Sequence, residues 1–102
     1  MYKNLLPIGS VVLLKGGNRK LMITGRIITD ESMKEIYDYV GVIYPVGVSG
    51  DGEQYFFNRD GIDSIYFIGF QDGEELTYRT EVLDQLGELV IKDGQIIPAE
   101  DA

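Results

Sequence analysis

The sequence contains no histidine and no cysteine. General acid-base and nucleophilic catalysis usually depend on these two side chains, so most hydrolase mechanisms have no candidate residues here. The absence of cysteine also excludes a disulfide framework and thiolate metal sites. We therefore expect a protein that is not an enzyme and that requires no metal and no cofactor.

Long apolar runs are also missing. No uninterrupted apolar segment approaches the roughly 18 residues that a membrane-spanning helix needs. The first residues hold no basic region followed by a long apolar run, because Pro7 and Gly9 interrupt them, and this is unlike a signal peptide. These features predict a soluble cytoplasmic protein without membrane insertion.

Positive charge is scarce and unevenly placed. The chain has nine Lys and Arg against 17 Asp and Glu, which gives a net charge of −8. Five of the basic residues and none of the acidic ones fall within residues 1–29. An acidic protein repels nucleic-acid phosphates, so binding to nucleic acid would require one shielded basic face. The candidates for that face are Lys15, Arg19, Lys20 and Arg26.

The length of 102 residues and the hydrophobic content of 44% suit one hydrophobic core. We expect a single β-rich domain over residues 1–97, followed by a polar tail over residues 98–102. The 13 glycines and the 11% of aromatic residues favour short strands joined by tight turns.

Five short strands are predicted between residues 10 and 70. The runs at residues 10–15 and 20–28 flank Gly16-Gly17-Asn18 and predict a hairpin, with a bulge or sharp bend at Gly25. Three further apolar or aromatic runs span residues 35–44, 54–57 and 64–70. The expected fold is α+β and mainly β: a small curled antiparallel sheet or partial barrel of about five strands, with one C-terminal helix packed on it.

The apolar period changes to about 3.6 residues after residue 73, which predicts a helix over about residues 74–87 that ends at Gly87. Asp93-Gly94 predicts a second hairpin over residues 90–97. Asn58 is expected to cap one helical turn over residues 60–63. The predicted core contains Val12, Leu14, Leu21, Ile23, Val42, Ile65, Phe67 and Leu83.

The acidic residues do not form a recognisable site. The pairs Asp30-Glu31, Glu74-Glu75 and Glu100-Asp101 fall in polar segments that are typical of solvated loops or helix starts. The segment from Asn58 to Asp63 is superficially similar to a calcium-binding loop, but its glycine falls at the fourth position and not at the sixth. We predict ordinary turns at these positions.

Tyrosine offers a large contact area with a hydrogen-bonding tip and is enriched at protein interfaces. Tyr37, Tyr39 and Tyr44 lie close together in the sequence and are the candidate protein-binding residues. The alternative is that these tyrosines pack within the sheet, because Tyr37 and Tyr39 share one strand face. Both interpretations remain open at this point.

Several ordered sequence blocks resemble a small uncharacterised family of Gram-positive bacteria, a domain of unknown function. The blocks are LLPIGSVVLLKGG at residues 5–17, LMITGR at 21–26, YDYVG at 37–41, YPVG at 44–47 and IYFIGF at 65–70. Members of this family are encoded beside LXG-type toxins of the type VII secretion system. The resemblance implies an adaptor or targeting chaperone that binds an LXG-type effector, or the helical targeting partner of that effector, in the cytoplasm before export.

Two other functions are compatible with the residues. An immunity protein would also be small and acidic, and it could neutralise a cognate toxin by covering a basic cleft. A small barrel-type nucleic-acid binder would use the basic residues of the first segment. Neither alternative requires catalytic residues or a small-molecule substrate.

Overall fold

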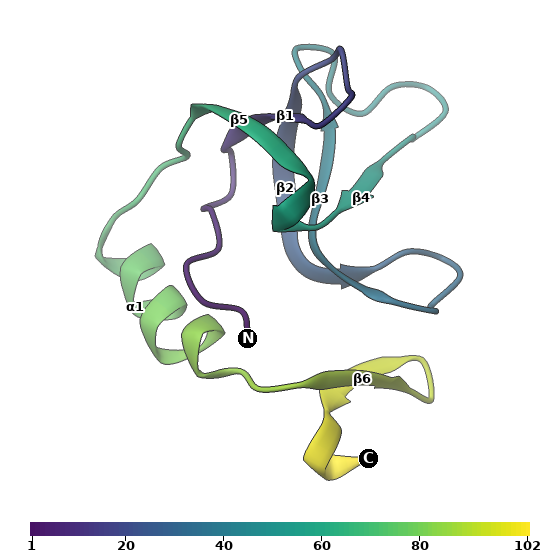
Figure 1. The fold of residues 1–102 in the computed structure, drawn as a ribbon, viewed down its shortest axis with the longest axis vertical. Helices are drawn as coiled ribbons and strands as arrows, with labels where there is room; N and C mark the ends of the chain where they lie inside the picture. The colour runs from purple at the N-terminus through teal and green to yellow at the C-terminus, as the bar shows by residue number, and fades with distance from the viewer.

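The computed structural model describes residues 1–102 and contains a five-stranded sheet, a separate two-stranded hairpin and one α-helix (Figure 1). The strands of the main sheet are β1 (Val11–Leu14), β2 (Leu21–Thr29), β3 (Ile36–Ile43), β4 (Tyr55–Phe57) and β5 (Ile62–Phe67). The helix α1 (Gly73–Glu81) precedes the hairpin of β6 (Leu89–Lys92) and β7 (Gln95–Pro98). This architecture confirms the predicted fold class.

The strand order of the main sheet is β4-β3-β2-β1-β5, and every neighbouring pair is antiparallel. A 3-10 turn, η1 (Arg59–Gly61), leads from β4 to β5, which returns to pair with β1. The sheet curls but does not close into a barrel, so β4 and β5 remain at its two edges (Figure 1).

The predicted bulge at Gly25 is confirmed, since the pairing of β2 with β3 shifts register between Ile23 and Gly25. A Cβ atom at Gly25 would lie 2.7 Å from Cγ1 of Val40, closer than packed side chains allow. Glycine therefore permits the close approach of the two strands where the sheet bends.

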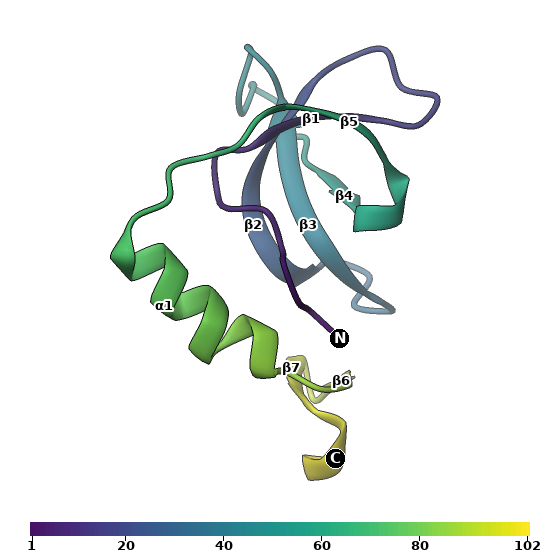
Figure 2. The same cartoon turned by 60° about the vertical axis from the view of Figure 1, so that its left-hand side comes forward.

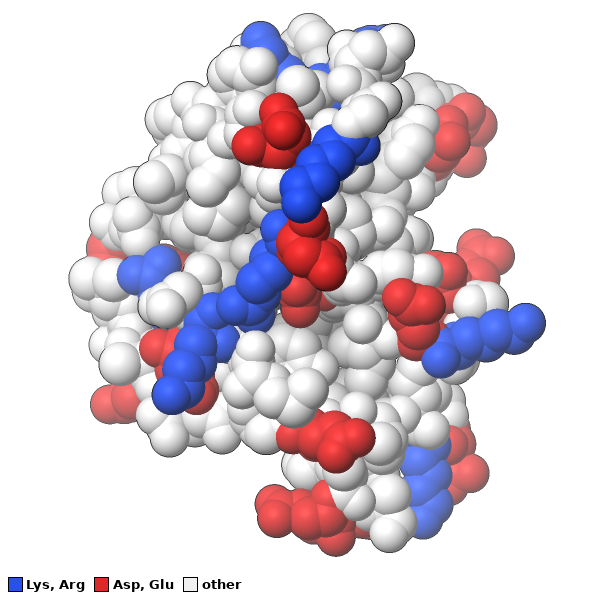
Figure 3. Space-filling model, viewed as in Figure 1, with Lys and Arg blue, Asp and Glu red and all other residues white.

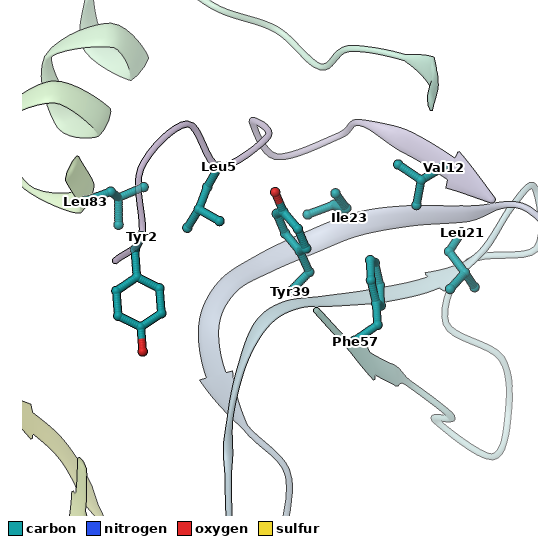
Figure 4. Close-up of a cluster of buried hydrophobic side chains, with 8 residues drawn as sticks. All are labelled: Tyr2, Leu5, Val12, Leu21, Ile23, Tyr39, Phe57 and Leu83. Atoms are coloured by element: carbon teal, nitrogen blue, oxygen red, sulfur yellow. The ribbon is translucent and has the colours of Figure 1, made fainter. Parts of the chain in front are cut away.

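The hydrophobic core lies between the curled sheet and the N-terminal segment (Figure 4). Residues 1–10 run between α1 and the sheet in both ribbon views (Figures 1 and 2) and supply Tyr2 and Leu5 to the core. The remaining core residues are Val12, Leu21, Ile23, Tyr39, Phe57 and Leu83. The core thus joins the sheet, the N-terminal segment and the turn after α1.

The predicted core is partly confirmed. Five of its members are buried: Val12, Leu21, Ile23, Val42 and Leu83. Leu14 is half-buried and packs against the core. The prediction is wrong for Ile65 and Phe67, whose exposed fractions are 51% and 60%. Both lie on the edge strand β5, where the five-stranded sheet ends and no further strand covers them.

The expected helix is present but shorter than predicted. It begins after Asp72, whose Oδ1 accepts a hydrogen bond of 3.0 Å from the backbone N–H of Glu75. It ends at Glu81 and not at Gly87, and a 3-10 turn, η2 (Leu83–Gln85), follows. No residue of α1 itself is buried, whereas Leu83 in η2 enters the core. The backbone changes from an α-helix to a 3-10 turn after Glu81, and this change directs the Leu83 side chain into the core.

The predicted second hairpin is confirmed. Asp93 and Gly94 separate β6 from β7 and both have positive φ, 52° and 76°. Two such residues in a two-residue loop fit the twist of an antiparallel hairpin, and glycine and aspartate tolerate this conformation. The expected helical turn after Asn58 is a 3-10 turn over residues 59–61, but Asn58 does not cap it. Its Oδ1 accepts the backbone N–H of Asp38 at 2.9 Å instead.

Candidate protein-binding surface

A group of large apolar side chains is exposed on β5 and directly after it. These residues are Ile65, Tyr66, Phe67, Ile68 and Phe70, and we call them the β5 surface. Their exposed fractions range from 51% to 78%. Single exposed apolar residues are common in proteins, but five among six consecutive residues form a patch that requires an explanation.

The β5 surface presents apolar groups on both faces of the sheet edge. Ile65 is paired with Val12, so both side chains lie on the inner face. Phe67 is paired with Val11, which is itself paired with Met22, and this row lies on the outer face. The change of face follows from a register shift that leaves Tyr66 as an extra residue on β5.

A shallow groove beside β5 extends the β5 surface across the outer face. Tyr66 and Phe67 line it together with Lys20, Met22 and Tyr44. The Nζ atom of Lys20 lies 5.0 Å from the centre of the Tyr66 ring. A cation over an aromatic face is attractive, and this contact supports the outward position of the tyrosine.

Gly69 fixes the backbone in the middle of the β5 surface. Its N–H donates a hydrogen bond of 2.9 Å to Oγ of Ser10, and the Ser10 hydroxyl donates one of 2.8 Å to the carbonyl of Pro7. Ser10 and Gly69 are buried, and a Cβ atom on Gly69 would lie only 2.1 Å from the carbonyl oxygen of Ile8. The glycine thus permits a close backbone contact while Ile68 and Phe70 on either side stay exposed.

An ion pair holds α1 next to the sheet. The Arg26 guanidinium donates two hydrogen bonds, of 2.8 and 2.9 Å, to the two carboxylate oxygens of Glu75. It also lies 5.6 Å from the centre of the Tyr78 ring. The side chains of Arg26 and Glu75 are only 8% and 13% exposed. This bidentate pair positions α1 beside Phe70, the last residue of the β5 surface.

The structure does not bring the three predicted tyrosines onto one surface. Tyr39 is buried with its ring 5.5 Å from that of Phe57, and its hydroxyl accepts a hydrogen bond of 2.9 Å from the N–H of Leu6 (Figure 4). Burial raises the pKa of Tyr39 above its ordinary value. Tyr39 therefore packs the core, as the alternative interpretation held.

The other two tyrosines lie at opposite ends of β3. Tyr37 is half-buried beside Phe56, with 5.7 Å between the ring centres. Tyr44 is 46% exposed and lines the groove next to β5. Sequence reasoning missed the β5 surface, although the unbroken apolar run at residues 65–68, without a period of two, was the available signal.

The basic residues of the first segment do not form one continuous basic surface. Arg26 is paired with Glu75, and Lys20 lies over Tyr66. Figure 3 shows Lys and Arg side chains interspersed with Asp and Glu side chains on the face in view.

No group of three or more His, Cys, Asp or Glu side chains is placed to hold a metal ion. Every buried side-chain nitrogen and oxygen atom has a hydrogen-bond partner. No helix has both the length and the apolar character needed to cross a membrane.

The fold and the surface define a small, mostly β domain whose open sheet carries an exposed apolar edge strand. The profile of the family described as "Domain of unknown function (DUF4176)" matches residues 5–78, and the chain belongs to this family. The matched region contains all five strands of the main sheet, the β5 surface and most of α1. The predicted membership of an uncharacterised family is thereby confirmed. No curated protein and no solved structure matches the chain.

Proposed function

We propose that this protein is a non-enzymatic accessory factor that binds another protein through the β5 surface. The observation that carries the proposal is the exposure of five large apolar side chains along and directly after one edge strand. Exposed apolar patches of this kind mark protein contact sites, because their burial against a partner removes apolar area from water.

The surroundings of the β5 surface favour specific binding over nonspecific apolar association. Gly69 and Ser10 fix the backbone beneath it, and Lys20 supports Tyr66. A rigid surface loses little conformational entropy on binding, so more of the contact energy contributes to affinity. Tyr44 adds a hydrogen-bonding group at the rim of the groove.

The class of partner comes from the sequence resemblance. We propose that the protein is an adaptor or targeting chaperone for an LXG-type effector of the type VII secretion system, and that it acts in the cytoplasm. The effector, or the helical targeting partner of the effector, would cover the β5 surface. The mostly β fold and the apolar surface suit the task of holding a partner.

The second candidate is an immunity protein, which the net charge of −8 favours. An acidic protein can cover a basic active-site cleft by electrostatic complementarity. This candidate assigns the contact to the acidic residues and leaves the β5 surface unexplained. The adaptor role is therefore the better supported of the two.

Co-purification separates the two candidates. The full chain is expressed with either the N-terminal targeting region or the C-terminal toxin domain of the LXG-type protein proposed as its partner. The adaptor role predicts binding to the N-terminal region that survives about 0.5 M salt, because salt of this concentration screens surface charges and the proposed contact is apolar. Salt-sensitive binding to the toxin domain alone would support the immunity role, and binding to neither region would overturn both.

A further inference from the structure

We propose that the partner contributes an extended segment that pairs with the free edge of β5 and adds a sixth strand to the sheet. This inference rests on the proposed function only in that it assumes a protein partner. It specifies the backbone conformation of the bound segment and its charge pattern.

The free edge of β5 is the longer of the two edges of the sheet. β5 has six residues, whereas β4 at the other edge has three. β5 pairs with β1 on one side only, and no backbone hydrogen bond outside the regular elements involves residues 62–67. Apart from the N–H of Ile62, which donates to the carbonyl of Arg59, its other side presents unpaired N–H and C=O groups, which are a template for strand addition.

Edge strands in proteins are usually protected by lysine, by proline, by β-bulges or by a covering element, and of these devices β5 has only the two register shifts in its pairing with β1. β5 contains neither lysine nor proline, and Asp63 is its only charged residue. A strand paired with β5 would have Ile65 beside it on the inner face and Phe67 beside it on the outer face. Apolar side chains on both faces of the added strand would thus find an apolar neighbour.

The charges near β5 determine the chemistry of the added segment. Asp60 and Asp63 lie at the start of β5, and Asp72 and Glu74 follow the β5 surface. Between these ends β5 itself carries only apolar residues and Ser64, and the ammonium group of Lys20 lies over the Tyr66 ring. The complementary segment has an apolar centre flanked by Lys or Arg residues.

The same charges argue against a second copy of this chain as the occupant. Each copy carries a net charge of −8, so two copies repel one another over the range of the Debye length. An antiparallel contact between two β5 strands would also bring the acidic start of each strand into the interface. We therefore assign the free edge to a different protein.

The test uses the full chain and a synthetic peptide, acetyl-Lys-Lys-Val-Thr-Val-Ile-Val-Thr-Lys-Lys-amide. Matched peptides carry either N-methyl groups on all six central amides or Glu in place of the four Lys. Binding is measured by isothermal titration, and the oligomeric state of the chain alone by analytical ultracentrifugation. We expect the first peptide to bind and each matched peptide to bind at least about tenfold more weakly, because strand addition needs backbone donors and complementary ends.

Two variants locate the binding site. Ile65→Lys is expected to abolish peptide binding, and Val48→Lys is the control, since Val48 is 65% exposed and lies outside the β5 surface. Equal binding of the N-methylated peptide, absence of binding by the first peptide, or unchanged binding to Ile65→Lys would each overturn strand addition. A dimer of the unliganded chain that Ile65→Lys dissociates would overturn the choice of occupant.

Failure of this inference is distinguishable from failure of the proposed function. If the peptide binds as expected while no region of the LXG-type protein binds, strand addition stands and the adaptor role fails. If the LXG-type protein binds the wild-type and Ile65→Lys chains equally while the peptide does not bind, the adaptor role stands and strand addition fails.

Discussion

Ile65 lies directly opposite Val12 in the pair formed by β5 and β1, yet Val12 is fully buried and Ile65 is 51% exposed. Directly opposed residues of antiparallel strands share one face of the sheet. The apolar inner face of this sheet thus continues past the core and ends in solvent at β5. A partner that covers this edge would extend the core instead of forming a separate contact.

The first prediction concerns the β5 surface itself. Replacing Phe67 and Phe70 by Ser should change the free energy of unfolding by no more than about 0.5 kcal/mol per site, since both side chains are largely exposed. Binding to the partner should weaken by about 2 kcal/mol or more if either residue is an anchor. Urea unfolding and a binding titration measure the two effects.

The control for this pair is Val48→Ser, at an exposed site outside the β5 surface, which should change neither quantity. A double variant that unfolds at a much lower urea concentration would show that Phe67 and Phe70 stabilise the fold. Unchanged affinity in a stable double variant would reject the β5 surface as the binding site.

The second prediction concerns Gly69. The Gly69→Ala variant should lose at least about 2 kcal/mol of stability, because the new Cβ atom would collide with backbone atoms that cannot move aside easily. Gly50→Ala is the matched control, since nothing lies within 4 Å of its Cβ position. Chemical denaturation of both variants tests the difference, and equal stability would show that the contact between residues 8–10 and Gly69 is not tight.

The third prediction concerns the pair of Arg26 and Glu75. Glu75→Gln should destabilise the protein by about 2 kcal/mol, because it leaves the guanidinium of Arg26 mostly buried without its carboxylate. Hydrogen exchange should quicken in α1 more than in β2 and β3. A double-mutant cycle with Arg26→Met isolates the coupling energy, and a coupling near zero would mean that the pair does not hold α1.

The fourth prediction concerns pH. Burial is the largest cause that raises the pKa of Tyr39 above 10.0, so the folded state favours the neutral phenol. The unfolded chain ionises first on raising the pH. The stability from this residue is therefore complete below about pH 10 and is lost as the pH rises through the folded pKa. Burial acts in the same direction on Tyr2.

Melting temperatures test this prediction. They are measured from about pH 8 to about pH 11, a range that includes the ordinary pKa of tyrosine. Tyr39→Phe should be less stable at pH 8, because the N–H of Leu6 loses its acceptor, but its melting temperature should fall less steeply above pH 10. Parallel curves for the two proteins would contradict the assignment to Tyr39.

Local patterns were sufficient to predict most of the strands. The glycine-rich turn after β1 and the Asp93-Gly94 hairpin depend on backbone conformations that few residue types adopt, and the bulge at Gly25 depends on the absence of a Cβ atom beside Val40. Such requirements are visible in the sequence, because they are met by neighbouring residues. The change of apolar period after residue 73 likewise predicts the start of α1, and the structure adds the cap at Asp72.

The binding surface could not be predicted in this way. Whether Ile65 is buried depends on what lies beyond β5, and the strand order that leaves β5 at an edge is a property of the whole chain. The tyrosines show the same limit. Tyr37 and Tyr39 lie two residues apart on β3, but only Tyr39 is fully buried, because it faces the N-terminal segment that folds back over the sheet. Long-range contacts decide which tyrosine is exposed.

The central claim is that a protein partner covers the β5 surface, and hydrogen exchange of the full chain measures this most directly. The chain is labelled alone and in complex with the LXG-type protein that it is proposed to bind, and exchange is compared segment by segment. The account predicts slower exchange in the complex over residues 62–70, with residues 48–53 unchanged. Protection that is confined to other segments while residues 62–70 exchange as in the free chain would contradict it.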